Sequence, residues 1–341
     1  MRFARSIQHQ MYRGLTIQPR DAEAADTPKT VISGLTRSVE RRQKRYNREI
    51  MSENFKTIQS IIILANPTVP EASEEARKVQ QAWQEMSSVT TTLATIDDLQ
   101  AQQRIAAGEF DLLIALGGDG TMLRAGHLAA PVGLPLLGIN LGRFGFLMQL
   151  RKDDWRAAIP RLLSGEFKLE NRMMLFAELL RGDQVLNSYQ VINEVVVCRG
   201  QFVRPISIFA SVDGYNLASY VADGLIAATP TGSTGYAMAV RGPILPPELR
   251  NILVVPVAPH LSMDHAIILP EGATVIFRPE TDHQAVMSID GHDPVVLQDG
   301  DRVRVSASEH ALKFVIFQDP GYFYRNLSLY REQNPSRNGF K

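Results

Sequence analysis

An apolar run that passes directly into a glycine cluster places the strongest constraint on the fold of this chain. Residues 111–121 read DLLIALGGDGT, and MLRAGHLAA follows at 122–130. Five consecutive apolar residues are typical of a buried strand, and the second stretch has the composition of a helix. A strand, a glycine loop and a helix in this order can bind phosphate, because backbone N–H groups and the helix N-terminus attract anions.

Asp119 lies between the glycines of this loop. Glycines permit positive φ and close approach of a ligand to the backbone, and Thr121 is placed to cap the helix that follows. A carboxylate repels phosphate, so Asp119 is better explained as the acceptor of a hydroxyl proton or as a partner of Mg²⁺. The alternative is a tight left-handed turn in which Asp119 bonds locally.

Strands and helices alternate on both sides of this loop. We expect strands at 61–66, 91–96 and 134–140, with a loop at 142–148. Helices are expected at 73–86, 98–108 and 153–165. This alternation predicts an α/β domain with a parallel sheet over residues 58–166.

The pattern changes after residue 166. Many short β-branched runs follow, among them YQVINEVVV, ISIFASV, ILVVPV and RVRVSAS, with turn residues between them. Such runs without long helices predict a β-sandwich-like, all-β domain over 167–306. We expect residues 307–341 to carry one strand and a helical tail, and to fold back on the α/β domain.

Charge and cysteine content exclude several classes of protein. The formal net charge is zero, which gives no general argument for binding nucleic acid or a membrane surface. The only cysteine is Cys198, so no disulfide can form within the chain, and a reducing compartment such as the cytoplasm is expected. No His and Cys residues have zinc-site spacing, and we assign no metal ligands.

Residues 1–57 are basic and are expected to be a disordered extension. The first twenty residues contain four arginines and no acid. That composition also resembles a mitochondrial targeting segment. A further alternative is translation from Met51, which directly precedes the first predicted strand.

Three further stretches in the second half carry candidate site residues. ADGLIAATPTGSTGY at 222–236 offers Asp223 with many hydroxyls, which suit phosphate and ribose, although the hydroxyls could equally bond within an array of turns. Asn193 and Glu194 interrupt an apolar strand, where burial of a carboxylate requires hydrogen bonds, unless a strand end leaves both solvated. Asp290 precedes a glycine, which is first of all a hairpin signal.

Together these motifs resemble the NAD kinase family. LGGDGT at 116–121, GINLGRFGFL at 138–147, Asn-Glu at 193–194 and DGLIAATPTGST at 223–234 follow the order of that family's motifs. The resemblance covers about residues 60–320, and the first 55 or so residues have no expected counterpart in the family's core. The GGDGT element alone is shared with lipid kinases and phosphofructokinases.

The resemblance implies a role for each matching residue. Asp119 is the implied general base at the 2′-hydroxyl of the adenosine ribose of NAD. The other implied binding residues are Gly117, Gly118, Gly120, Thr121 and Arg124 around the phosphates, Phe146, Asn193 and Glu194 around adenine and ribose, Asp223 on the nicotinamide side, and Thr231, Ser233, Thr234, Gly235, Tyr236 and Asp290 along the rest of the site.

The implied reaction transfers the γ-phosphoryl of ATP, or of another phosphoanhydride such as polyphosphate, to NAD, with Mg²⁺ as cofactor. A homodimer or homotetramer is the implied assembly. The alternatives are a non-catalytic NAD(P)-binding sensor on the same fold and a related lipid kinase. The sequence departs from the family at Gly235, where alanine is usual, and at Arg241, where the usual Gly-Gly-Pro-Ile reads RGPI.

Overall fold

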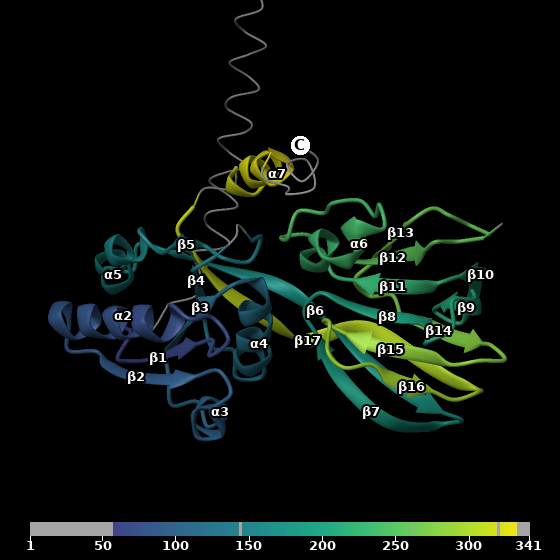
Figure 1. The fold of residues 1–341 in the computed structure, drawn as a ribbon, viewed down its shortest axis with the longest axis horizontal. Helices are drawn as coiled ribbons and strands as arrows, with labels where there is room; N and C mark the ends of the chain where they lie inside the picture. Colours follow the sequence, from purple (N-terminus) through teal and green to yellow (C-terminus); the bar gives the residue numbers. More distant parts are fainter. Residues whose placement is uncertain (1–56, 143–144, 261, 319–320, 333–341) are drawn as a thin grey trace, which may run out of the picture. The chain divides into compact units, whose positions relative to one another are not determined.

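The structure is a computed structural model, and it describes residues 57–142, 145–260, 262–318 and 321–332. The predicted fold class is confirmed, because an α/β region with parallel strands is followed by a largely antiparallel β region (Figure 1).

The first region alternates strands and helices as predicted. Its elements are β1 (Ser60–Ala65), α2 (Ala72–Met86), β2 (Thr90–Thr95), α3 (Leu99–Ala106), β3 (Leu112–Gly117), α4 (Asp119–Ala129), β4 (Leu136–Asn140), β5 (Leu150–Arg151) and α5 (Trp155–Leu163). The parallel strands lie in the order β4-β3-β1-β2. The carboxyl end of β3, the strand of the glycine loop, therefore lies in the interior of the sheet, where ligand sites of open parallel sheets are found.

Helices cover both faces of this sheet because side chains of a strand alternate between faces. Ile61 and Ile63 of β1 pack with α2 and α5, whereas Ile62 and Leu64 pack with α3 and α4. The near-continuous apolar run of β1 thus reflects a strand that is buried on both sides.

The second region contains most of the remaining strands. They are β6 (Lys168–Arg181), β7 (Gln184–Val191), β8 (Glu194–Arg199), β9 (Ile206–Val212), β10 (Tyr215–Ala222), β11 (Gly224–Ala228), β12 (Asn251–Val257), β13 (Ile267–Pro270), β14 (Val275–Glu280), β15 (Ala285–Ile289), β16 (Val295–Leu297) and β17 (Asp301–Ile316). The short helices η2 (Thr231–Thr234) and α6 (Tyr236–Ala239) follow β11, and α7 (Tyr322–Glu332) ends the described chain.

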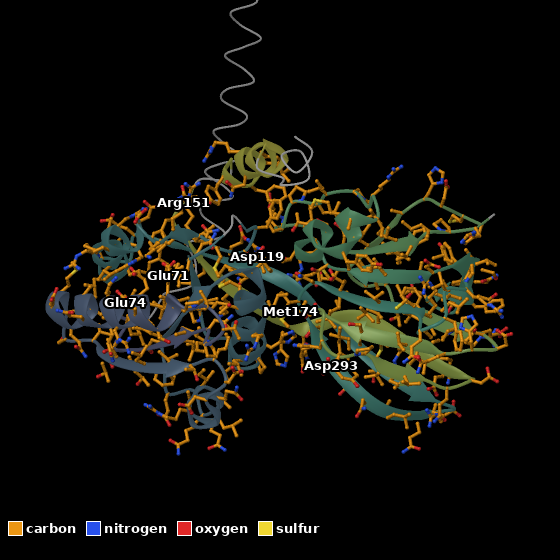
Figure 2. The ribbon with its side chains drawn as sticks, viewed as in Figure 1. Glu71, Glu74, Asp119, Arg151, Met174 and Asp293 are labelled. Carbon is orange, nitrogen blue, oxygen red and sulfur yellow. The ribbon has the colours of Figure 1, made fainter. Side chains whose placement is uncertain are left out.

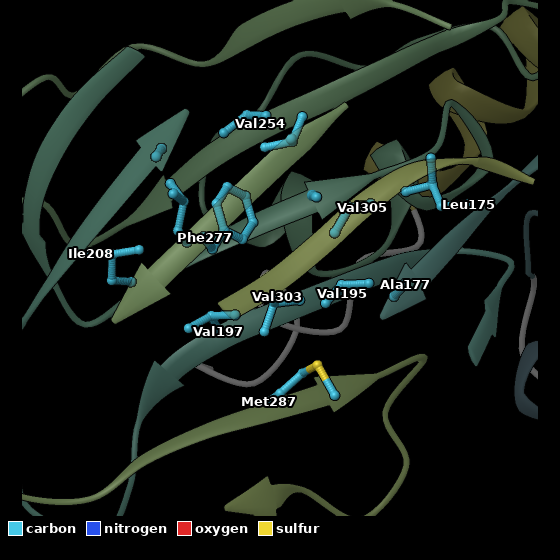
Figure 3. Packing of buried hydrophobic residues seen from close by; sticks show 14 of the residues in the cluster. Leu175, Ala177, Val195, Val197, Ile208, Val254, Phe277, Met287, Val303 and Val305 are labelled. Atoms are coloured by element: carbon cyan, nitrogen blue, oxygen red, sulfur yellow. The ribbon is translucent and has the colours of Figure 1, made fainter. Parts of the chain in front are cut away.

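Two sheets pack face to face around the core of the second region. One has the order β13-β12-β11-β8-β15-β16, and the other includes β6, β9, β14 and β17. Figure 3 shows side chains from both sheets meeting in this core, with Val195 and Val197 of β8 on one side and Val303 and Val305 of β17 on the other.

β17 joins the two regions. It pairs with β6 and β14 in antiparallel fashion, and its Phe314 pairs in parallel with Leu136 of β4. RVRVSAS and LKFVI are therefore one strand rather than two, and this strand crosses the limit that we expected at residue 306. Within the described residues, none of the helices has the length and apolar character needed to span a membrane.

Two local expectations were wrong. YQVINEVVV is two strands, with a break at Ile192 and Asn193. The helix after the glycine loop begins at Asp119 rather than at residue 122. GLIAA at 224–228 forms the fully buried strand β11, which leads into TPTGST.

Candidate active site

Asp119, labelled in Figure 2, is the first residue of α4, and the backbone of residues 146 and 147 contacts its carboxylate. Its Oδ2 accepts a hydrogen bond from the backbone N–H of Phe146 at 2.9 Å, and its Oδ1 accepts one from Leu147 at 3.1 Å. A Cβ at Gly145 would overlap this carboxylate. Residues 145–147 and Asp119 therefore fit one another closely.

Burial raises the pKa of the Asp119 carboxyl above its ordinary value. The two backbone N–H groups oppose this shift, and so does the positive charge of Arg172. Asp119 thus combines an elevated pKa with groups that hold its ionised form in one orientation, which suits a general base.

The glycines of the loop and Asp119 do not adopt positive φ, so the tight left-handed turn that we considered as the alternative is absent. Gly117 is needed for another reason, since a Cβ there would overlap the Thr121 side chain. A Cβ at Gly118 or Gly120 would meet nothing within 4 Å. These two glycines place no side chain over the backbone at the start of α4, so a ligand can approach its N–H groups, which favour anions.

Thr121 lies in the first turn of α4 and is not its N-cap, which is Gly118. Its hydroxyl oxygen accepts a hydrogen bond from the side chain of Asn66 at 2.8 Å. Asn66 directly follows β1, so this contact ties the end of that strand to the first turn of α4. Arg124, three residues further along α4, forms an ion pair with Asp97.

Asn193 and Glu194 lie where β7 gives way to β8. The backbone C=O groups of Ile192 and of Asn193 accept hydrogen bonds from Thr229, at 2.6 Å from its hydroxyl and 2.9 Å from its N–H. Glu194 is only 8% exposed, so the solvated strand end that we considered is ruled out for it.

Asp290 holds the same break from the opposite side. Its carboxylate accepts the backbone N–H groups of Ile192, Asn193 and Glu194 at 2.7–3.0 Å, and it also lies 2.8 Å from the Nε2 of His127. Asp290 and the next residue both have positive φ in the turn between β15 and β16, so the predicted hairpin is present. Asp290 thus forms the turn between β15 and β16 and also holds the backbone of residues 192–194 in place.

The pKa of Glu194 is raised from 4.5 to about 7. Burial is the main cause and the negative charge of Asp290 adds to it, while the backbone N–H of Tyr236 acts in the opposite direction. The Oε2 atom of Glu194 is buried without a hydrogen-bond partner, and so are Asn193 Oδ1 and Thr231 Oγ1. Buried polar atoms are normally paired, so these three are suited to bind a polar ligand.

The hydroxyls of Ser233 and Thr234 bond to backbone groups of their own turn and, for Ser233, of the segment that follows it. Ser233 is fully buried, and its hydroxyl donates to the C=O of Pro230 at 2.6 Å and accepts the N–H of Leu245 at 2.9 Å. The Thr234 hydroxyl donates to the C=O of Thr231 at 3.1 Å. These two side chains therefore shape the turn, and Thr231 keeps the one hydroxyl oxygen of this turn that lacks a partner.

Of the two departures from the family pattern, Gly235 has a local explanation and the arginine at position 241 has none in the structure. A Cβ at Gly235 would lie 2.8 Å from Oε2 of Glu194, so the glycine leaves room for this carboxylate. Arg241 has φ of +66°, which is a conformation that favours glycine. Tyr236 is 43% exposed beside this turn.

Asp223 forms an ion pair with Arg199, with 3.0 Å between Oδ1 and Nε. Arg199 lies at the end of β8, five residues after Glu194. The structure thus brings Asn193, Glu194, Thr231, Gly235, Tyr236 and Asp290 into one cluster, and it places Asp119 and Phe146 in another. Sequence reasoning missed His127, Asn66, Thr229, Arg172 and Arg199, because each acts through contacts with distant segments.

Fold and site together define the class. An α/β region presents a buried acid at a bare helix start, and the adjoining β sandwich supplies a second cluster of polar atoms, as in a kinase that acts on a nucleotide.

Comparison with known proteins identifies the family. Residues 14–167 match the family model of the ATP-NAD kinase N-terminal domain, and residues 192–317 match that of the ATP-NAD kinase C-terminal domain. The NAD kinase of Chloroflexus aurantiacus is 33% identical over 270 residues, which cover 79% of this chain and 97% of the relative. That of Symbiobacterium thermophilum is 40% identical over 229 residues, 67% of this chain and 80% of the relative. The chain belongs to the NAD kinase family.

Solved structures show that the fold is shared. The yeast NADH kinase complexed with NADH matches with a TM-score of 0.72 and 22% identity, over 82% of this chain and 89% of that one. An NAD kinase from Archaeoglobus fulgidus in complex with ATP matches with a TM-score of 0.63 and 22% identity, over 80% and 98%. The N-terminal family match starts at residue 14, inside the segment that we expected to have no counterpart in the family's core.

Proposed function

We propose that this protein is an NAD kinase, which transfers the γ-phosphoryl group of ATP to the 2′-hydroxyl of the adenosine ribose of NAD. The observation that carries this proposal is the buried Asp119 carboxylate at the bare start of α4. One short segment thereby offers a base and an anion-binding backbone.

The proposed reaction is an in-line displacement. The 2′-oxygen of NAD forms a bond to the γ-phosphorus, the bond from that phosphorus to the bridging oxygen breaks, and ADP leaves. The proton of the 2′-hydroxyl passes to Asp119. Phosphoryl transfer depends mainly on positioning and on stabilisation of charge, so the bare N–H groups near Gly118 and Gly120 would hold the donor phosphates.

The second cluster is suited to the adenosine part of NAD. Asn193 Oδ1, Glu194 Oε2 and Thr231 Oγ1 are buried without partners. The N–H groups of adenine and the O–H groups of ribose could donate hydrogen bonds to these unpaired oxygens. Phe146, whose backbone N–H bonds to Asp119, would add an aromatic ring for the adenine. Asp223, with Arg199, would lie toward the nicotinamide.

Mg²⁺ is proposed to arrive with ATP. Across the part of the chain that the structure describes, no three His, Cys, Asp or Glu side chains are grouped as a protein-built metal site requires. Magnesium in kinases is commonly held by phosphate oxygens with few carboxylates, and it neutralises charge on the phosphates.

A cytoplasmic location and a homodimer or homotetramer are further proposals, supported by the family and by the lack of a disulfide. Light scattering of the purified protein tests the assembly. A single species with the mass of the monomer would refute it.

The central test of function measures product. Purified protein is incubated with ATP, Mg²⁺ and NAD, and NADP is quantified with an NADP-specific dehydrogenase. Formation of NADP supports the proposal, and binding of NAD without any product supports the sensor alternative. Phosphorylation of diacylglycerol in place of NAD would indicate a lipid kinase. Glu194→Ala should raise the KM for NAD, and an unchanged KM would remove Glu194 from the ribose site.

A further inference from the structure

A hydrogen bond connects the helix that carries Asp119 to Asp290, the residue that holds the strand break at Asn193 and Glu194. His127 lies two turns after Asp119 on α4, about 12 Å further along the helix axis. Its Nε2 lies 2.8 Å from Oδ2 of Asp290, whose side chain is completely buried.

Asp290 in turn binds the backbone of the strand break. Its two oxygens accept the N–H groups of three consecutive residues, 192–194, which lie where the ladder of the sheet is interrupted. Thr229 holds two carbonyl groups of the same segment. The backbone that carries Asn193 and Glu194 is thus fixed from both sides, and one side is connected to α4.

Close packing at the neighbouring residue supports the same connection independently. A Cβ at Gly126 would lie 2.7 Å from Cδ1 of Ile192 and 2.8 Å from Cδ2 of Leu312. α4 therefore approaches residue 192 as closely as its backbone permits, directly beside His127. The spacing between α4 and the break is set by contact as well as by the hydrogen bond.

We propose that His127 is a positioning residue, which acts through Asp290 to set the distance between Asp119 and the Asn193–Glu194 segment. This inference rests on the proposed function, because the two clusters must hold one substrate. Asp119 has to meet the 2′-hydroxyl of a ribose whose adenosine is bound by the second cluster. A bridge between the clusters therefore controls how well that hydroxyl is placed.

The test compares His127→Ala, His127→Gln and His292→Ala in the full-length protein. The His127→Ala change should lower kcat by about 10- to 100-fold, because small misplacements of reacting groups cost this much. The KM for NAD should rise a few-fold, whereas the KM for ATP should stay within two-fold, since Asn66 and Thr121 hold the start of α4 separately.

The two other variants distinguish positioning from general stability. His127→Gln keeps a side-chain N–H group that can donate a hydrogen bond to Asp290, so this variant should recover most of the kcat. His292 is exposed, and its ring lies 5.5 Å from that of His127 at a tilt of 47°, so His292→Ala removes the ring contact and keeps the hydrogen bond. Equal losses in His127→Ala and His292→Ala, or no recovery in His127→Gln, would overturn the inference.

Two further measurements test the positioning role of His127 separately from the proposed function and from misfolding. Hydrogen exchange of amides 192–194 should be faster in His127→Ala than in the wild type, and unchanged exchange would overturn the inference whatever the enzyme does. Gly126→Ala keeps His127 but forces α4 away from Ile192, so it should also lower kcat. If the wild type forms no NADP while the exchange result holds, the proposed function fails and the bridge remains.

Discussion

The raised pKa of Glu194 leads to a prediction about stability. Glu194→Gln removes the charge and keeps the shape of the side chain. In the folded protein Glu194 has a pKa of about 7, against 4.5 for an ordinary glutamate. The unfolded chain therefore loses its proton first as pH rises, and the wild type loses stability between pH 4.5 and pH 7.

The size of this loss follows from the shift. Each unit of pKa difference corresponds to about 1.4 kcal/mol, so the full effect is about 3 kcal/mol, most of it acquired between pH 4.5 and pH 7. Gln does not titrate in this range. The free energy of unfolding of Glu194→Gln relative to wild type should therefore rise by about 2 to 3 kcal/mol from pH 5 to pH 8.5.

Urea denaturation of both proteins at pH 5, 6, 7, 8 and 8.5, at one protein concentration and without nucleotide, measures this difference. Ser288→Ala is a suitable control, since its hydroxyl lies near the same turn and bonds to the C=O of His292. A difference between Glu194→Gln and wild type that stays constant across these pH values would refute the reasoning.

Two further predictions concern Asp119. Gly145→Ala should lower kcat by about 100-fold, because a Cβ there would overlap the Asp119 carboxylate and displace it. Gly142→Ala in the same loop, where a Cβ meets nothing within 4 Å, should leave kcat unchanged. Equal kcat values for the two variants would show that the close contact between Gly145 and Asp119 does not matter for the reaction. Arg172→Gln should move the acidic limb of the pH profile of kcat to higher pH, because the Arg172 charge lowers the pKa of Asp119. Arg278→Gln is its matched control, since Arg278 also lies over a phenylalanine ring and pairs with a glutamate; a profile of Arg172→Gln that coincides with the wild type would exclude this role.

The alternation of strands and helices in the first region could be read from the sequence because it depends on local patterns. Ile61–Leu64 are apolar without a break, which fits a strand buried on both faces. The Asp-Gly pair at 290–291 likewise formed the expected turn. Such features need only neighbouring residues to specify them.

The architecture around Asn193 and Glu194 could not be predicted in this way. The strand break is stabilised by Asp290, which lies 97 residues from Asn193, and by Thr229 from a third segment. Because no local pattern encodes these partners, an apolar run with two polar residues looked like one strand. His127 was overlooked for the same reason.

The glycines of GGDGT illustrate a different limit. Composition shows that a side chain is absent, but it does not show why. At Gly117 the reason is close contact with Thr121, and at Gly118 and Gly120 it is an open backbone. Positive φ, the most familiar reason for glycine in a loop, is found at none of the three.

The claim that Asp119 accepts the proton of the 2′-hydroxyl is tested most directly by single-turnover kinetics of Asp119→Asn. ATP, Mg²⁺ and excess enzyme are mixed with NAD, formation of NADP is followed by rapid quench, and the Kd for NAD is measured separately by calorimetry. Loss of a general base should slow the chemical step by about 10²–10⁴-fold, with the Kd for NAD within a few-fold of the wild type. A rate constant equal to that of the wild type, with NAD bound equally well, would contradict the account.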